Sequence, residues 1–171
     1  VSREYAHMLL DYNYPPAQPW FDEGFVQYFS SLKMGDKAGA IGGDPDGSFV
    51  ATLNSSDWIT IPDLFSQKIF SGCNADMRQQ LFCAESWIVM HYLVNNGRLS
   101  DVGPYFNAVI VHKTPVNTAI EQAFGVNAHQ LQKSVQEYFH SDTDPGNSGT
   151  PAAAIDDPVP FPLSDLGLPS T

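Results

Sequence analysis

Apolar residues recur at helical spacing through most of the first 140 positions of the chain. The strongest pattern predicts a helix over residues 76–95, with Gly97 at the position where a glycine commonly ends a helix. Its apolar stripe consists of Leu81, Ala84, Ile88 and the pair His91 and Tyr92. A second pattern predicts a helix over residues 22–32. The stripe of this second helix consists of Phe25, Tyr28, Phe29 and Leu32.

Weaker patterns complete the expected fold. They predict helices over residues 2–10, 99–111, 115–124 and 128–140, and a short amphipathic element over residues 61–70. Segment 35–47 is rich in glycine and aspartate, which is typical of a loop. Strand-like alternation of apolar and polar residues is scarce. The sequence therefore predicts a mainly α fold.

The composition changes after residue 140. Residues 141–171 hold six of the 13 prolines and five aspartates, and they contain no Lys or Arg. Proline-rich acidic sequence without apolar periodicity is typical of an extended tail or linker. We therefore expect one folded domain over residues 1–140, followed by a tail or linker over residues 141–171.

Charge restricts the classes of partner. The 171 residues include 8 basic and 19 acidic side chains, which give a formal net charge of −11. This charge argues against a nucleic-acid partner, because binding to phosphates requires a cationic face. It also argues against docking on an anionic membrane surface. No apolar run approaches the ~20 residues that span a bilayer, so we expect no membrane span.

Cys73 and Cys83 lie ten residues apart, a spacing that is not typical of a metal site. They either form a disulfide in an oxidising compartment or remain two free thiols in a core. Charged residues make up only 16% of the chain, and its polarity comes largely from Asn, Gln, Ser and Thr, as is common in exported proteins. The first residues lack the pattern of a signal peptide. We therefore expect a mature or trimmed protein with an extracytoplasmic location.

Segments 3–7 (REYAH) and 19–25 (PWFDEGF) hold the residues best suited to chemistry. On a helix, positions 3 and 7 face the same way, with position 4 beside them. A histidine at position 3 would complete a zinc motif, in which two imidazoles hold the metal and the glutamate between them deprotonates a bound water. Glu23 is placed to supply a third, carboxylate ligand. The simpler alternative is an amphipathic helix with His7 in a core and Glu4 in solvent.

Taken together, the two segments resemble the gluzincin zinc metallopeptidases, and more closely the peptidase-MA-like group also called DUF1570. The stretch REYAHMLL is similar to that family's HEYTHLLL, and QPWFDEGFVQYF is similar to its PPWLNEGLAEYF. Farther along, FCAESWIVMHYLVNNG is similar to the family's third helix, and AIEQAFGVNAHQLQKSVQEYF to its closing pair of helices. The resemblance covers about residues 1–140. Its most specific positions are Trp20, Glu23, Gly24 and Tyr28.

This resemblance implies the active-site helices of a thermolysin-like zincin, a C-terminal helical subdomain, and zinc as the cofactor. By position, Glu4 matches the general base, and His7 and Glu23 match two metal ligands. Arg3 stands where the first histidine ligand belongs. A guanidinium has no lone pair for a metal, and one imidazole with one carboxylate is too small a set for a tight zinc site.

The departure at Arg3 suggests a substitute for the metal. We hypothesise that the Arg3 guanidinium pairs with Glu4 and Glu23 and joins the two helices without catalysis. The resemblance also implies a β-sheet before the first of these helices, lining the peptide cleft. There is no room for such a sheet before Ser2, so either an upstream segment or a separate chain supplies it, or the cleft is absent.

The sequence therefore predicts a metallopeptidase-like domain whose zinc-dependent hydrolysis of peptide bonds is impaired, with a peptide or protein as its substrate or partner. The alternative is a non-catalytic binding or structural module on a degenerate zincin scaffold. His91 and Tyr105 are candidate stabilisers of an oxyanion. The other interpretation is core packing for His91 and packing at an interface for Tyr105.

Overall fold

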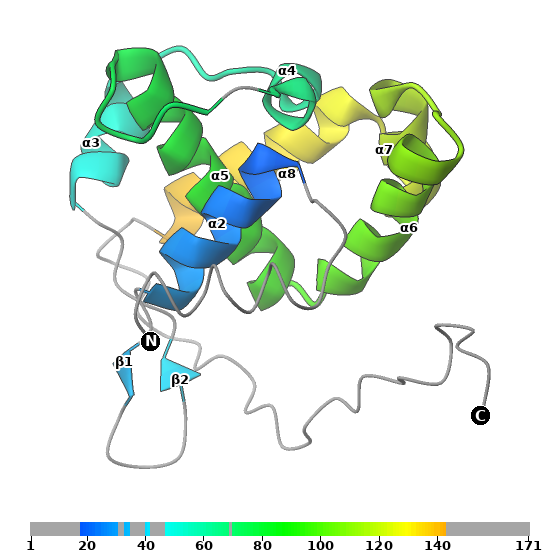
Figure 1. Ribbon diagram of the computed structural model, residues 1–171. Helices are drawn as coiled ribbons and strands as arrows, with labels where there is room; N and C mark the ends of the chain where they lie inside the picture. Colours follow the sequence, from blue (N-terminus) through cyan, green and yellow to red (C-terminus); the bar gives the residue numbers. More distant parts are fainter. Residues whose placement is uncertain (1–17, 31–32, 35–39, 42–46, 69, 143–171) are drawn as a thin grey trace, which may run out of the picture.

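The computed structural model describes residues 18–30, 33–34, 40–41, 47–68 and 70–142. Within these residues the chain is mainly helical, which confirms the predicted fold class (Figure 1). In chain order the elements are α2 (Pro19–Ser30), β1 (Lys33–Met34), β2 (Ala40–Ile41), α3 (Gly47–Ser55), α4 (Ile61–Ser66), α5 (Met77–Asn95), η1 (Leu99–Asp101), α6 (Val102–Phe106), η2 (Asn107–Val111), α7 (Val116–Phe124) and α8 (Ala128–Asp142). The helix predicted over residues 2–10 lies outside the described residues, as does the predicted tail beyond residue 142.

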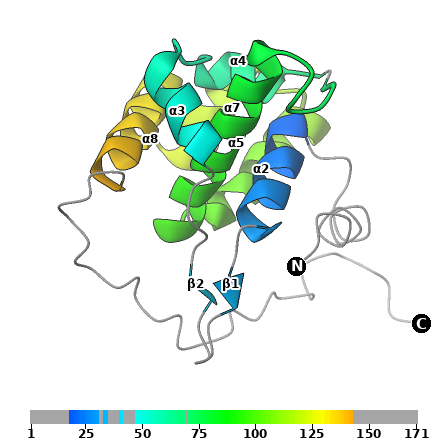
Figure 2. The same ribbon diagram turned by 90° about the vertical axis from the view of Figure 1, so that its left-hand side faces the viewer.

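Helix α5 is the central element, and α2, α3 and α8 pack against it (Figures 1 and 2). Both of its ends lie where the sequence predicts. The Asp76 carboxylate accepts a hydrogen bond from the backbone N–H of Gln79 at 2.8 Å, and Gly97 follows the last turn with a φ of 64°. The predicted single stripe is too narrow, however, because every residue of segment 81–93 is buried. A helix surrounded by neighbours buries all of its faces.

Helix α2 begins at Pro19, three residues before the predicted start. The fixed φ of proline suits the first turn of a helix, and the Phe21 N–H donates to the carbonyl of Gln18 at 2.9 Å. The predicted stripe is right only in part: Tyr28 is buried, whereas Phe25 and Phe29 are partly buried. Its fourth member, Leu32, lies outside the described residues. The residues that α2 buries are Trp20, Phe21, Glu23, Gly24, Val26 and Tyr28.

Helices α2 and α5 cross closely at Gly24. A Cβ atom at this position would lie 2.4 Å from the carbonyl oxygen of Ser86 and 3.2 Å from the Cβ of Met90. The first distance is far below van der Waals contact, so the crossing needs a residue without a side chain. This contact gives a physical reason for the glycine that follows Glu23.

Four other parts of the fold differ from the prediction. Helix α3 was not expected, because its sequence GSFVATLNS is rich in residues with weak helix propensity. Strand β2 lies inside the predicted loop and pairs antiparallel with β1, with Met34 opposite Ala40. The amphipathic element predicted over residues 61–70 ends as a helix at Ser66. The helix predicted over residues 99–111 is correctly placed, but it consists of a 3₁₀ turn, a short α-helix and a π turn.

An aromatic cluster joins the start of α2 to α4 and α6. The rings of Trp20 and Phe65 stack with centroids 3.9 Å apart, and Tyr105 meets Phe65 edge-on at 5.2 Å. The Tyr105 hydroxyl donates to Gln18 Oε1 at 2.9 Å. These contacts fix the first turn of α2, the helix that carries Glu23. Across the described part of the chain, no helix combines the length and the apolar character that a membrane crossing needs.

Candidate functional site

Glu23 is the predicted zinc ligand that lies within the described residues. Its side chain is only 2% exposed, although carboxylates are usually at the surface. The Oε1 atom of Glu23 accepts a hydrogen bond at 2.5 Å from Nε2 of Gln27, one turn farther along α2. Burying a carboxylate without such a partner is costly, so Gln27 is part of what holds it in place.

Cys73 and Cys83 form a disulfide, which decides between the two alternatives left by the sequence. Cys83 lies on α5 and is fully buried, whereas Cys73 lies in the loop before α5 and is partly buried. The Cα atoms of the pair are 5.7 Å apart. The disulfide is compatible with the predicted extracytoplasmic location.

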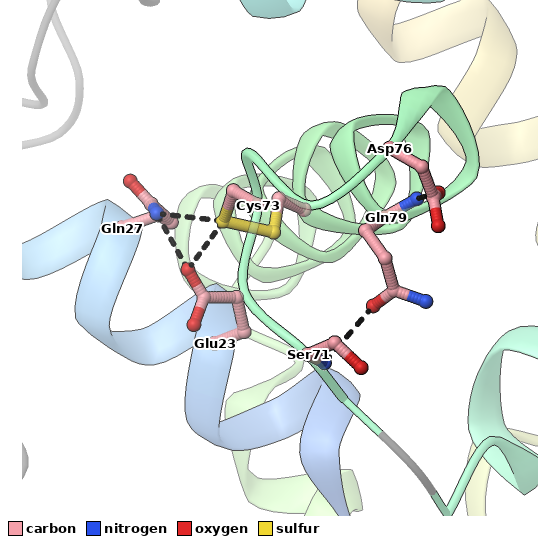
Figure 3. The surroundings of a disulfide bond; sticks show 7 residues. Glu23, Gln27, Ser71, Cys73, Asp76 and Gln79 are labelled. Carbon is pink, nitrogen blue, oxygen red and sulfur yellow. Dashed lines mark hydrogen bonds between the residues drawn. A yellow bond between two sulfur atoms is a disulfide. The ribbon is translucent and has the colours of Figure 1, made fainter.

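The disulfide lies directly against Glu23 (Figure 3). Cys73 Sγ is 3.1 Å from Glu23 Oε1 and 3.6 Å from Gln27 Nε2. A disulfide sulfur carries no hydrogen, so its contact with the carboxylate oxygen is not a hydrogen bond. The amide of Gln27 is the donor that faces both acceptors. Sequence analysis missed this contact because it joins residues 50 positions apart.

The loop that carries Cys73 is held at both ends. Gly72 has a φ of 97°, a conformation that favours glycine, and its carbonyl accepts a hydrogen bond from the Ala75 N–H at 3.1 Å. Before the turn, the Ser71 N–H donates to Gln79 Oε1 at 3.4 Å (Figure 3). After the turn, Asp76 caps α5. Cys73 is therefore positioned by the backbone of the loop as well as by its disulfide.

A hollow of about 290 Å³ opens beside Glu23. It is lined by Pro19, Asp22, Glu23, Lys68 and Phe70. A small ligand there would meet acidic groups from α2 and the ammonium group of Lys68. A second hollow, of about 400 Å³, lies between residues 56–63 and the start of α5, and none of the predicted site residues lines it.

The metal-binding potential of this site depends on its redox state. The ligand atoms of Glu23, Cys73 and Cys83 lie within 4.8 Å of one another. Zinc binds thiolates, and a disulfide offers none, so the oxidised group does not fit a zinc ion. Arg3, Glu4 and His7 lie outside the described residues. Their predicted roles, and the pairing of Arg3 with the two glutamates, remain predictions.

The structure places both candidate oxyanion stabilisers in the core. Burial raises the pKa of Tyr105, although its hydrogen bond to Gln18 acts in the opposite direction. His91 Nδ1 lies 2.7 Å from the hydroxyl of Tyr138 on α8, and its ring packs against Tyr28 at 5.5 Å. These contacts agree with the core-packing interpretation of His91, whereas Tyr105 is fully buried in the core and not at an interface of the described chain. An oxyanion role for either one remains a prediction.

Glu85 is a second buried carboxyl group, which the sequence analysis did not single out. Its side chain is 1% exposed within α5, and its Oε1 accepts the backbone N–H of Ile59 at 2.6 Å. Burial raises the pKa of Glu85 to about 8, against the lowering effect of that hydrogen bond. The Glu85 carboxyl therefore fastens the segment before α4 to the central helix and is largely protonated at neutral pH. In the sequence, Glu85 could have been noticed only as a lone acidic residue within an apolar run.

Comparisons of the chain with family models, with curated proteins and with solved structures found no match.

Proposed function

We propose that the chain is a metallopeptidase-like domain of the gluzincin type, in which Arg3 impairs zinc-dependent hydrolysis of peptide bonds. The observation that best supports the proposal is the buried carboxylate of Glu23, beside a hollow of about 290 Å³. Helix α2 holds this carboxylate close to α5 through the contact at Gly24. A buried carboxylate at the edge of a hollow is suited to bind a cation, either a metal or a guanidinium.

The roles of the chain's own residues follow from the motif. His7 and Glu23 are the two ligands that remain, and Glu4 is the group that accepts a proton from the attacking water. Zinc, when bound at such a site, would supply Lewis acidity for the hydrolysis of a peptide bond. Arg3 contributes a fixed positive charge in place of the third ligand, which opposes metal binding and pairs with the carboxylates. The substrate class is a peptide or protein.

A second candidate function follows from the same substitution. A scaffold that holds Arg3 against Glu4 and Glu23 keeps its shape without a metal, and its remaining role is to bind a peptide or protein partner. Arg3 favours this non-catalytic module, because a guanidinium cannot act as a ligand.

Metal content tests the proposal. The oxidised protein and its Arg3→His variant are dialysed against buffer with trace zinc, and the zinc bound per chain is measured by elemental analysis. We expect almost none in the unchanged protein and close to one per chain in Arg3→His, because the variant completes a three-ligand set. Arg78→His, at an exposed position on α5, is the matched control for an added histidine and should bind none.

Peptide hydrolysis is then measured on the same samples. Arg3→His should gain activity, and the double variant Arg3→His/Glu4→Gln should keep its zinc and lose that activity. Zinc in neither protein would contradict the gluzincin scaffold. Zinc in the unchanged protein that disappears in His7→Ala would contradict the impairment by Arg3.

A further inference from the structure

We propose that reduction of the Cys73–Cys83 disulfide creates a metal site, in which the two thiolates and the Glu23 carboxylate bind Zn²⁺. The inference goes beyond the proposed function, because it requires neither Arg3 nor His7. It shares only Glu23 with that proposal.

The geometry brings three ligand atoms together before any metal binds. The Glu23 oxygen and the two sulfurs lie within 4.8 Å of one another. Zn–S bonds of about 2.3 Å at a tetrahedral angle require sulfurs about 3.8 Å apart. Rotation about the Cα–Cβ bonds can open the pair to this distance, since the Cα atoms are already 5.7 Å apart. The turn at Gly72 and helix α5 hold the two backbones in place.

The negative charge of the reduced cluster is the reason to expect that it binds a cation. In the oxidised state the cluster carries one negative charge, that of the Glu23 carboxylate. Two thiolates raise this charge to three, and a bound Zn²⁺ returns it to one, so the metal-bound site is no more charged than the oxidised site. Two added thiolate charges, one of them at the fully buried Cys83, are costly without a counter-charge. The reduced cluster therefore either keeps its thiols protonated or takes up a cation.

Nearby groups complete the site. The Gln27 amide already faces both Glu23 Oε1 and Cys73 Sγ, and a donor to the charged form of a thiol favours that form. Three protein ligands leave the fourth position of a tetrahedral zinc for a water molecule, and a hollow opens beside one of the three, Glu23.

The chemical step is a two-electron reduction by a dithiol. One reductant thiolate attacks the partly buried Cys73 sulfur, because Cys83 is fully buried, and the S–S bond breaks with Cys83 as the leaving thiolate. The second reductant thiolate attacks the mixed disulfide, which releases Cys73 and leaves the reductant as its own disulfide. The two reductant protons pass to the cysteines. Both protons go to the buffer when the two Zn–S bonds form.

Cobalt binding tests the inference, since Co²⁺ replaces zinc and gives a thiolate charge-transfer band in the near ultraviolet. The full chain is reduced with an immobilised phosphine, which is removed before anaerobic titration with Co²⁺ and then Zn²⁺. We expect close to one Co²⁺ per reduced chain with this band, displacement by Zn²⁺, and no band in the oxidised protein.

Two variants test the proposed ligands, and a third serves as their control. Cys73→Ser should abolish the charge-transfer band or weaken Co²⁺ binding at least about tenfold. Glu23→Gln should also weaken binding at least about tenfold, because even the loss of groups that only support a ligand costs about 10–100-fold. Glu121→Gln, at an exposed position on α7, is the matched control and should leave the affinity unchanged.

Two outcomes would overturn the inference. In the first, the reduced protein keeps its helical circular dichroism but binds no Co²⁺. In the second, the Glu23→Gln variant binds Co²⁺ with full affinity. If reduction unfolds the chain, excess Zn²⁺ must restore the helical signal, and failure to do so counts against the site. His7→Ala separates the two proposals: it should remove any metal bound at the gluzincin site and leave the thiolate band intact. Loss of the band in His7→Ala would contradict the site proposed here.

Discussion

At the scale of single residues, the two buried glutamates differ in how far the sequence revealed them. Glu23 stands in a recognisable pattern after Trp20, so the sequence already marked it as a candidate ligand on a helix. Glu85 has no such pattern, and only the fold shows that its Oε1 lies 2.6 Å from the Ile59 nitrogen. Its partner lies 26 positions earlier, beyond the reach of any helical periodicity.

Glu85 should make stability fall as the pH rises. Its pKa is about 8 in the folded chain and close to 4.5 when exposed, so between these values the folded state binds more protons than the unfolded state. The stabilisation is complete below about pH 4.5 and is lost as the pH rises through about 8. Glu85→Gln removes the titration and keeps an acceptor for Ile59. The effect of Glu85→Gln on the free energy of unfolding should therefore depend on pH. We expect it to be more stabilising at pH 8 than at pH 5, by about 1–3 kcal/mol.

Urea unfolding of both proteins at pH 5 and pH 8 measures this difference. Glu121→Gln, an exposed position, controls for the loss of one acidic group and should show no such difference. Parallel pH profiles for Glu85→Gln and the unchanged protein would show that Glu85 is ionised in the fold throughout this range.

At the scale of elements, the close crossing of α2 and α5 depends on Gly24. Gly24→Ala places a methyl group 2.4 Å from the Ser86 carbonyl oxygen, so the helices must separate. We expect a loss of about 1–3 kcal/mol in the free energy of unfolding, as in other overpacked cores.

Gly47→Ala is the matched control for Gly24→Ala. Gly47 is also helical, and an added Cβ there would meet no heavy atom of the described residues within 4 Å, apart from its chain neighbours and the backbone of its own helix. The control should be neutral or slightly stabilising, because alanine favours the helix over glycine. Equal effects of the two substitutions would mean that the helix crossing tolerates a side chain at position 24.

Element boundaries were predictable where local chemistry fixes them. Asp76 and Gly97 mark the ends of α5 in the sequence, because capping and a positive φ depend on neighbouring backbone atoms. Helix α3 has no comparable signal. It forms beside α5, against which it packs, so tertiary contact outweighs its weak local propensity.

At the scale of the whole molecule, the disulfide joins α5 to the loop that lies against α2. A cross-link that closes a loop of about ten residues stabilises a fold by about 2–3 kcal/mol in the chain-entropy model. We expect reduction in the presence of a metal chelator to lower the free energy of unfolding by this amount, measured by urea titration.

The double variant Cys73→Ala/Cys83→Ala provides the control, since its stability should not respond to the reductant. Zn²⁺ added to the reduced protein in place of the chelator should restore part of the loss, because binding to the folded state adds its own free energy. Unchanged stability after complete reduction would show that the cross-link restrains little in the unfolded chain.

The sequence by itself determined the helical class, the limits of α5, and the candidate residues Glu4, His7 and Glu23. These features depend on the spacing of apolar residues and on short motifs, which act over one or two helical turns. Its resemblance to the gluzincins remains the basis of the proposed function.

Only the tertiary structure decided that α5 is buried on every side, that Cys73 and Cys83 are bonded, and that this bond lies against Glu23. Each of these facts depends on segments far apart in the chain. Their positions follow from the packing of whole helices, such as the crossing at Gly24, and local patterns do not specify that packing.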